Sequence, residues 1–330
     1  MIITRTPLRI SFFGGGTDMP AWYGEYGGAV LSTTIDKYQY ITCRRLMPYW
    51  NYKHQFVYGS ANEMVSEFNE IRHPSIRETL QYFNISYGLD MHYNTDIPAR
   101  SGMGSSSAFT VGFVNALYGM AGKMPNKRRL AVDAIHIEQD LIRETVGSQD
   151  QIAVAFGGLN YIEFKKEGGF FVHPVTIGKR RKEDLEKHLV LVFSGFSRFA
   201  SEVEKKKLES LAKKQSVLHE MQGMVQEALD VLTGDKDLRL FGEMLDHTWR
   251  LKRSLADEVS TSAIDELYER GLRSGAIGGK LLGAGGGGFV LFFCEPEKQA
   301  HLLERLNGYL HVPFHFEENG SQVIYYREEA

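Results

Sequence analysis

PARSGMGSSSAF, residues 98–109, places two glycines and three consecutive serines between a polar turn and an apolar run. MHYNTDIP, just before Ala99, alternates like a β-strand, and SSSAFTVGFVNALYGM has the apolar spacing of a buried helix. A glycine-rich turn therefore leads into a helix N-terminus, where the N–H groups near Gly102 and Gly104 and the helix dipole favour a bound anion such as phosphate. A plain helix cap explains the same residues, because Gly and Ser are ordinary turn and cap residues.

The composition indicates a folded, soluble protein of two domains. The chain has 330 residues, 43% hydrophobic and 24% charged, and a formal net charge of −3. These values exclude global disorder, and the net charge gives no overall positive charge that would favour binding of nucleic acid. Since no window reaches the ~18 apolar residues of a membrane span and no signal peptide is visible, we expect neither export nor membrane insertion. Cys43 and Cys294 lie far apart in apolar runs, which favours buried thiols in the cytoplasm.

Several further elements can be read along the chain. Residues 1–60 are rich in strand formers, and the pattern of 126–146 predicts a helix capped by Asn126 and stopped at Gly147. QIAVAFGGLNYIEFKK then reads as a pair of strands across Gly157 and Gly158. The charged connector 178–188 is our candidate boundary, which gives domains at 1–185 and 186–330.

The second part of the chain alternates helices and strands. Two helical stretches are expected at 197–234 and 237–259, and the Lys/Glu-dense part at 201–215 reads as solvated helix surface. A short helix follows around 263–275. Four successive glycines in KLLGAGGGGFV then lead into the strand FVLFFC, and VIYYREEA looks like a final strand.

Two acidic residues lie at the edge of apolar segments. Glu138 is three or four residues from Ile135, Leu141 and Ile142, which puts it on the buried face of its predicted helix. Asp150 follows in GSQDQ, directly before an apolar run. A buried carboxylate needs a partner charge, a metal or a proton, and Mg²⁺ fits beside serine hydroxyls. Each acid taken singly is also explained by a helix cap or an ion pair.

A third polar cluster lies in RTPLRISFFGGGTD near the N-terminus. Arg9 precedes the turn Gly14–Gly16, and Asp18 follows it. Glycines let a backbone approach a small polar ligand closely, and Asp18 could accept hydrogen bonds from hydroxyls. A plain turn with an Asx cap is the alternative.

Together these stretches resemble the GHMP kinase superfamily of galactokinase, homoserine kinase, mevalonate kinase and phosphomevalonate kinase. PARSGMGSSSA resembles its P-x-x-x-G-L/M-G-S-S-A motif and KLLGAGGGGFV its K-x-x-G-A-G-G-G-G motif, in the right order over nearly the whole chain. RTPLRISFFGGGTD is most similar to the D-glycero-D-manno-heptose 7-phosphate kinases, then to the kinase portion of fucokinase; Gly15 and Gly16 replace the Glu and His of the galactokinase turn. The resemblance implies an α+β fold of two domains, the first like ribosomal protein S5 domain 2 and the second ferredoxin-like, with the active site in the cleft between them.

The resemblance also implies the role of each site residue. Asp150 would be the catalytic base, with Arg9 steadying it or the transferred phosphoryl group, and Ser106 and Glu138 would ligate Mg²⁺. The ATP phosphates would be held by Ser101, Gly102, Met103, Gly104, Ser105, Ser106 and Ser107. The acceptor would be bordered by Gly15, Gly16, Thr17, Asp18, Gly285 and Gly286.

The expected reaction is ATP-dependent phosphorylation at O1 of D-glycero-D-manno-heptose 7-phosphate to the 1,7-bisphosphate, for nucleotide-activated heptose used in surface polysaccharide. Lys252 and Arg253, beside Trp249, would bind the terminal phosphate if they face the cleft, but a solvated turn of helix explains them equally well. A kinase of an unphosphorylated sugar such as fucose, and a catalytically silent sugar-binding regulator, are the alternatives. We expect only small-molecule substrates, no nucleic acid or membrane partner, and a monomer or homodimer.

Overall fold

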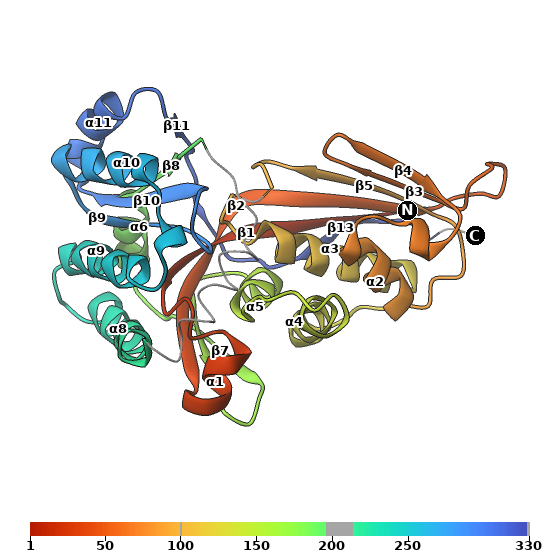
Figure 1. The fold of residues 1–330 in the computed structure, drawn as a ribbon, viewed down its shortest axis with the longest axis horizontal. Helices are drawn as coiled ribbons and strands as arrows, with labels where there is room; N and C mark the ends of the chain where they lie inside the picture. Colours follow the sequence, from red (N-terminus) through yellow and green to blue (C-terminus); the bar gives the residue numbers. More distant parts are fainter. Residues whose placement is uncertain (100, 196–213, 329–330) are drawn as a thin grey trace.

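The computed structural model describes residues 1–99, 101–195 and 214–328. Two β-sheets organise the fold, and the long strands β1 (Ile2–Phe13) and β2 (Gly28–Arg45) form the centre of the larger one (Figure 1). Within the described residues this sheet has nine strands, in the order β13-β1-β2-β5-β3-β4, with β12 and β6 on β2 and β7 on β6. Its other strands are β3 (His54–Tyr58), β4 (Ala61–Val65), β5 (Leu89–Thr95), β6 (Asn160–Phe164), β7 (Phe170–Pro174), β12 (Phe316–Glu317) and β13 (Gln322–Tyr326).

Helices cover one side of the larger sheet, as Figure 1 shows. They are α2 (Pro74–Tyr82), α3 (Ser105–Met120), α4 (Lys127–Ile135) and α5 (Gln149–Phe156), while α1 (Pro20–Tyr26) joins β1 to β2 and a 3₁₀ turn spans Phe68–Glu70. Helix α3 is buried almost all round and packs on β1 and β2. A Cβ on Gly112 would lie 2.7 Å from Thr6 Oγ1, so this glycine permits the close approach of helix and strand.

The smaller sheet is antiparallel, in the order β11-β8-β10-β9. Its strands are β8 (Leu189–Phe193), β9 (Ala276–Leu281), β10 (Phe289–Cys294) and β11 (Leu310–His311). The accompanying helices are α6 (Lys179–Lys187), α8 (Gln215–Thr233), α9 (Arg239–Arg253), α10 (Ser262–Arg273) and α11 (Pro296–Arg305), with a 3₁₀ turn at Asp257–Val259. The chain then returns to the larger sheet through β12 and β13. A division at residues 185 and 186 stays a proposal.

One hydrophobic core continues from the first sheet into the second. Phe12 and Phe13 of β1 make edge-on contacts with Phe241 of α9, with ring centroids 5.3 and 5.0 Å apart. The two parts of the fold are therefore packed against each other next to the Gly14–Gly16 turn.

The helix predicted at 126–146 begins as expected but ends early. The Asn126 side chain accepts a hydrogen bond from the Arg129 N–H at 2.8 Å, which confirms the cap. After Ile135 the helix widens into a π-helical turn, His136–Leu141, and Arg143 has a φ of +62°. The stop at Gly147 is wrong. A Cβ there would lie 1.8 Å from Asp18 Oδ2, so Gly147 is needed for a close approach rather than for a cap.

Two other expectations need correction. The run from Gln149 to Phe156 is helix α5, not a strand, because a short apolar run fits either structure and periodicity alone does not decide. The charged connector at 178–188 forms α6. Most of the Lys/Glu-dense stretch at 201–215 lies outside the described residues. Cys43 and Cys294 are both buried and do not form a disulfide, as expected. Among the described helices, none is long and apolar enough to cross a membrane.

Candidate active site

A cavity of about 1000 Å³ opens where the three glycine-rich segments meet. The first segment contributes Gly15 and Gly16, and the second contributes Gly102, Gly104 and the three serines that follow. The third contributes Gly283, Ala284, Gly285 and Gly287. The structure therefore brings together segments that are far apart in the sequence. Gly286, predicted to border the acceptor, is not among the lining residues, whereas Gly285 is.

The second and third glycine segments touch through their backbones. A Cβ on Gly283 would lie 2.5 Å from the Cα of Gly102, and a Cβ on Gly288 would lie 2.3 Å from the carbonyl oxygen of Ser101. The Phe289 N–H donates to that same oxygen at 3.1 Å. Only residues without a side chain allow this contact, which closes one wall of the cavity.

The serine-rich turn forms the N-terminus of α3 at the cavity. Gly104 is the N-cap residue, with a φ of +73°, and Ser105 begins the helix. The first-turn N–H groups lack partners within the helix, so they and the dipole can hold phosphate oxygens. Ser105, Ser106 and Ser107 line the cavity, and Ser106 is exposed there. Ser101 and Met103, also predicted to bind nucleotide, are buried and do not line it.

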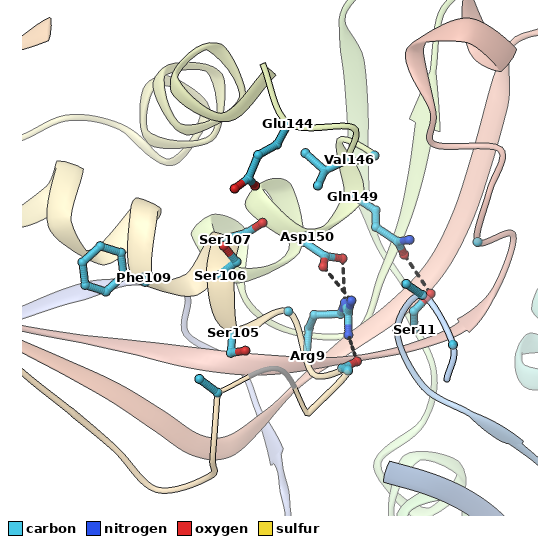
Figure 2. A pocket seen from close by; sticks show the side chains of 18 of the residues that line it. Arg9, Ser11, Ser105, Ser106, Ser107, Phe109, Glu144, Val146, Gln149 and Asp150 are labelled. Atoms are coloured by element: carbon cyan, nitrogen blue, oxygen red, sulfur yellow. Dashed lines mark hydrogen bonds and ion pairs between the residues drawn. The ribbon is translucent and has the colours of Figure 1, made fainter. Parts of the chain in front are cut away.

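Arg9 and Asp150 form a bidentate ion pair inside the cavity (Figure 2). Arg9 Nε donates to Oδ1 at 2.7 Å and Nη2 donates to Oδ2 at 2.6 Å, while Nη1 donates to the Gly102 carbonyl at 2.7 Å. Arg9 is only 3% exposed. The pair fixes the direction of the Asp150 carboxylate at the first turn of α5, beside the serine-rich turn.

Glu138 lies behind the cavity wall rather than in it. Its side chain is 1% exposed, and Oε2 accepts hydrogen bonds from Ser107 at 2.9 Å and from Gln151. Oε1 has no partner among the described residues. Burial raises the pKa of Glu138 to about 7, against hydrogen bonds that lower it. A buried carboxylate oxygen without a partner, beside serine hydroxyls, fits a divalent cation that favours oxygen ligands.

Glu144 is a second carboxylate on this side of the cavity, and the sequence did not indicate it. It lines the cavity, and Figure 2 shows it on the same side as Ser106 and Ser107. Burial raises its pKa. Only the π-helical turn and the left-handed backbone at Arg143 bring it there, and neither is visible in an apolar periodicity.

The Gly14–Asp18 turn is tied to the loop before α5. Gly14 has a φ of +83°, and a Cβ there would lie 1.9 Å from the Ala29 carbonyl oxygen. Thr17 is buried and donates to that oxygen at 2.9 Å, away from the cavity. Asp18 lines the cavity but is 4% exposed; it accepts from the N–H groups of Gly16 at 2.8 Å and Gln149 at 3.4 Å. That Asp18 also binds a sugar hydroxyl stays a prediction.

The structure brings Lys252 to the cavity but not Arg253. Lys252, near the end of α9, donates to the carbonyl oxygens of Leu281, at 3.0 Å, and Gly283. Arg253 points elsewhere, with its guanidinium 3.4 Å from Asp265. Neighbouring positions on a helix are about 100° apart, so two consecutive cations rarely face one cleft.

Aromatic rings line another part of the cavity, which the sequence did not predict. His73 is in ring contact with Tyr58 and with Phe109, at centroid distances of 5.0 Å each, and Tyr93 lies 5.3 Å from Phe109. The exposed Arg72 lines the same cavity. Such rings can stack against a planar base. These residues come from β3, β5, α3 and the segment directly before α2, so no local sequence motif predicts them.

Comparison with known proteins agrees with this geometry. The model of the GHMP kinases N terminal domain matches residues 69–158, and that of the GHMP kinases C terminal domain matches residues 201–311. The chain is 29% identical to a D-glycero-alpha-D-manno-heptose 7-phosphate kinase of Campylobacter jejuni over 322 residues, covering 92% of this chain and 93% of that one. It is 26% identical to a bifunctional fucokinase/GDP-fucose pyrophosphorylase of Arabidopsis thaliana, covering 91% of this chain and 30% of that one.

A solved structure supports the same fold. The crystal structure of a D-glycero-D-manno-heptose 1-phosphate kinase from Bacteroides thetaiotaomicron superposes with a TM-score of 0.81 at 22% identity, covering 99% of this chain and 100% of that one. At that identity the likeness establishes the fold.

Proposed function

The chain belongs to the GHMP kinase family and is an ATP-dependent phosphotransferase acting on a sugar hydroxyl, and on that premise we propose that it phosphorylates O1 of D-glycero-D-manno-heptose 7-phosphate to give the 1,7-bisphosphate. The observation that carries the choice of sugar is the similarity to the Campylobacter jejuni heptose 7-phosphate kinase, which spans nearly the whole of both chains.

In the proposed mechanism Asp150 accepts the proton of the anomeric hydroxyl. Arg9 holds both carboxylate oxygens, so the base is oriented before the sugar arrives. An anomeric hydroxyl is more acidic than an ordinary alcohol, and a carboxylate can therefore take its proton late in the transfer. The phosphoryl group travels toward the anomeric oxygen between Asp150 and the N-terminus of α3, whose N–H groups stabilise charge on the phosphate oxygens.

We propose ATP and Mg²⁺ as cofactors. Ser106, exposed in the cavity, and Glu138, with its unpartnered Oε1, would hold the ion. When bound, Mg²⁺ would neutralise negative charge on the ATP phosphates, which is the main contribution of a metal to phosphoryl transfer. The adenine would stack among the rings of Tyr58, His73, Tyr93 and Phe109.

The terminal phosphate of the sugar would lie beside Lys252, on the side of the cavity formed by the smaller sheet. A kinase of a free sugar such as fucose is the second candidate, favoured by the similarity to the Arabidopsis fucokinase over 91% of this chain. A silent sugar-binding regulator would need neither the base proposed at Asp150 nor the metal ligands proposed at Ser106 and Glu138.

ADP release over a panel of acceptors tests the proposal. Heptose 7-phosphate, free heptose, fucose and galactose are each supplied with ATP and Mg²⁺. The proposal expects the fastest release with heptose 7-phosphate. Equal rates on free and phosphorylated heptose, or faster release with fucose, would favour the free-sugar kinase. No release above the rate without sugar would favour the regulator.

A further inference from the structure

Gln149 is a polar residue of the cavity to which the reaction described above assigns no role. It directly precedes Asp150 and is the first residue of α5. Figure 2 shows its side chain near the Arg9–Asp150 pair, with its amide group joined to Ser11. Its place beside the base puts it where the acceptor must bind.

Strand β1 holds Gln149 and Asp150 in the same way. Arg9 and Ser11 are two positions apart on β1, so their side chains leave the same face of the strand. Arg9 binds the Asp150 carboxylate, and Ser11 Oγ donates to Gln149 Oε1 at 2.7 Å. Ser11 is 6% exposed, which limits the movement of its hydroxyl. The amide of Gln149 is therefore positioned by the same rigid strand as the base.

The bond to Ser11 leaves Gln149 as a hydrogen-bond donor toward the cavity. Oε1 already accepts from Ser11, and in the described parts of the chain no group accepts from Nε2. The Gly14–Gly16 turn lies close by, since a Cβ on Gly15 would be 3.8 Å from Nε2. Gly15 and Gln149 both line the cavity, and a larger residue at position 15 would crowd this amide.

We propose that Gln149 is a specificity-determining residue, whose Nε2 donates a hydrogen bond to a non-reacting oxygen of the acceptor sugar. The identity of the sugar rests on the function proposed above, while the donor role rests on the Ser11 bond. A proton acceptor and a neutral donor on consecutive residues match a polyol: one hydroxyl gives its proton to Asp150, and another oxygen accepts from the amide. A sugar that lacks this oxygen leaves the amide desolvated and unpaired, which disfavours its binding.

The first test is steady-state kinetics of Gln149→Met, which removes the donor and keeps the length of the side chain. We expect kcat/KM for the sugar to fall about 10- to 100-fold, while KM for ATP is unchanged. Gln226→Met is the matched control, because Gln226 is an exposed glutamine on α8 that bonds to Asp230. It should leave both constants unchanged.

A set of monodeoxy analogues of the acceptor separates recognition from structural support. The parent protein should discriminate strongly against the analogue that lacks one particular hydroxyl, and Gln149→Met should lose this discrimination. Ser11→Ala, which frees the amide without deleting it, should weaken discrimination against the same analogue. The proposal would be overturned if Gln149→Met lost kcat/KM equally on every analogue, or if it discriminated between the analogues as strongly as the parent does.

The sugar for these measurements is the one that the parent protein phosphorylates fastest in the acceptor panel. A wrong choice of heptose 7-phosphate therefore shows in the parent protein alone. Failure of the Gln149 inference shows only when the variants are compared with the parent. Thermal unfolding of each variant checks that it is folded. If Gln149→Met does not fold, the discrimination measured in the milder variant Ser11→Ala still tests the proposal.

Discussion

Among single residues, the proposed reaction depends most on Asp150, the carboxylate that Arg9 holds in the cavity. Asp150→Asn keeps the shape of the side chain and removes its capacity to take a proton. We expect turnover to fall ~10²–10⁴-fold, because proton transfer contributes that much, while binding of ATP is nearly intact. Titration with a non-hydrolysable ATP analogue and ADP release measure the two effects. Turnover within a few-fold of the parent would remove Asp150 from the mechanism.

Glu138 and Ser106 are tested by their effect on the metal requirement. In the proposed magnesium site, Ser106→Ala removes an oxygen ligand and Glu138→Gln removes the negative charge of a ligand, so both should raise the Mg²⁺ concentration at half-maximal rate. Glu227→Gln, an exposed residue of α8, serves as the control. Mn²⁺ binding followed by electron paramagnetic resonance gives a reading that does not depend on turnover. If both titrations match the parent, the metal is held elsewhere.

At the scale of elements, contact between two glycine-rich turns shapes the cavity. Gly283 has a φ of +71°, and a Cβ there would lie 2.5 Å from the Cα of Gly102, so Gly283→Ala must push the turns apart. We expect it to lower the free energy of unfolding by about 1–3 kcal/mol and to weaken ATP binding. Gly223→Ala is the contrast, because a Cβ in that part of α8 meets nothing within 4 Å. It should stabilise the protein by roughly 0.5–1 kcal/mol.

Thermal unfolding with and without ATP measures the stability and the ATP binding of both glycine variants. The account predicts a lower Tm and a smaller ATP-induced rise in Tm for Gly283→Ala, and a higher Tm with the full ATP-induced rise for Gly223→Ala. An alanine tolerated at position 283 with no change in either quantity would contradict the backbone contact.

Strand β3 begins with a buried histidine that should make stability depend on pH. His54 is fully buried and stacks on Phe56, and neither ring nitrogen has a partner among the described residues. Burial lowers its pKa from 6.5 to about 4. As the pH falls, the imidazole is therefore protonated in the unfolded chain before it is protonated in the folded protein. The stabilising effect of the neutral, buried ring is complete above pH 6.5 and is lost as the pH falls toward 4.

The loss amounts to at most about 3 kcal/mol at the acid end. His54→Leu replaces the titratable ring with an apolar side chain. It should reduce the decline in the free energy of unfolding between pH 6.5 and 4. Urea unfolding at several pH values measures this decline in the parent and the variant. Equal declines in the two proteins would show that His54 does not contribute.

Elements with a long or alternating pattern were predictable from the sequence, and those that depend on tertiary contact were not. The strand ending at Thr95 and helix α3 follow from residue spacing alone, and the buried position of Glu138 follows from its helical face. The sequence predicts a strand where helix α5 lies, because an apolar run this short fits either structure. Glu144 reaches the cavity through a π-helical turn, which leaves no mark in the apolar periodicity.

At the scale of the whole molecule, the cavity is shared by both parts of the fold. Asp150 and Arg9 come from elements on the larger sheet, while Lys252 and Gly285 come from those around the smaller one. Lys280 joins the parts directly, since its Nζ donates to the carbonyl oxygens of Ser11, at 2.9 Å, and Phe12, at 2.7 Å. An acceptor bound in the cavity would therefore contact both parts only while they keep this packing.

Lys252 tests the contribution of the smaller sheet. Lys252→Met should reduce kcat/KM for heptose 7-phosphate about 10- to 150-fold relative to free heptose, because a desolvated contact between a cation and a phosphate is worth roughly 1.5–3 kcal/mol. Lys123→Met, an exposed lysine after α3, is the control. A Lys252→Met variant that keeps the full preference for the phosphorylated sugar would place the terminal phosphate beside other cations.

The position of the new phosphate is the most direct test of the proposed reaction. The protein is incubated with ATP, Mg²⁺ and D-glycero-D-manno-heptose 7-phosphate, and the products are followed by phosphorus NMR with coupling to protons. The account predicts ADP and a new phosphate resonance coupled to the anomeric proton, with the 7-phosphate retained. A new phosphate on any other carbon, or no sugar phosphate formed from this acceptor while fucose or galactose is phosphorylated, would contradict it.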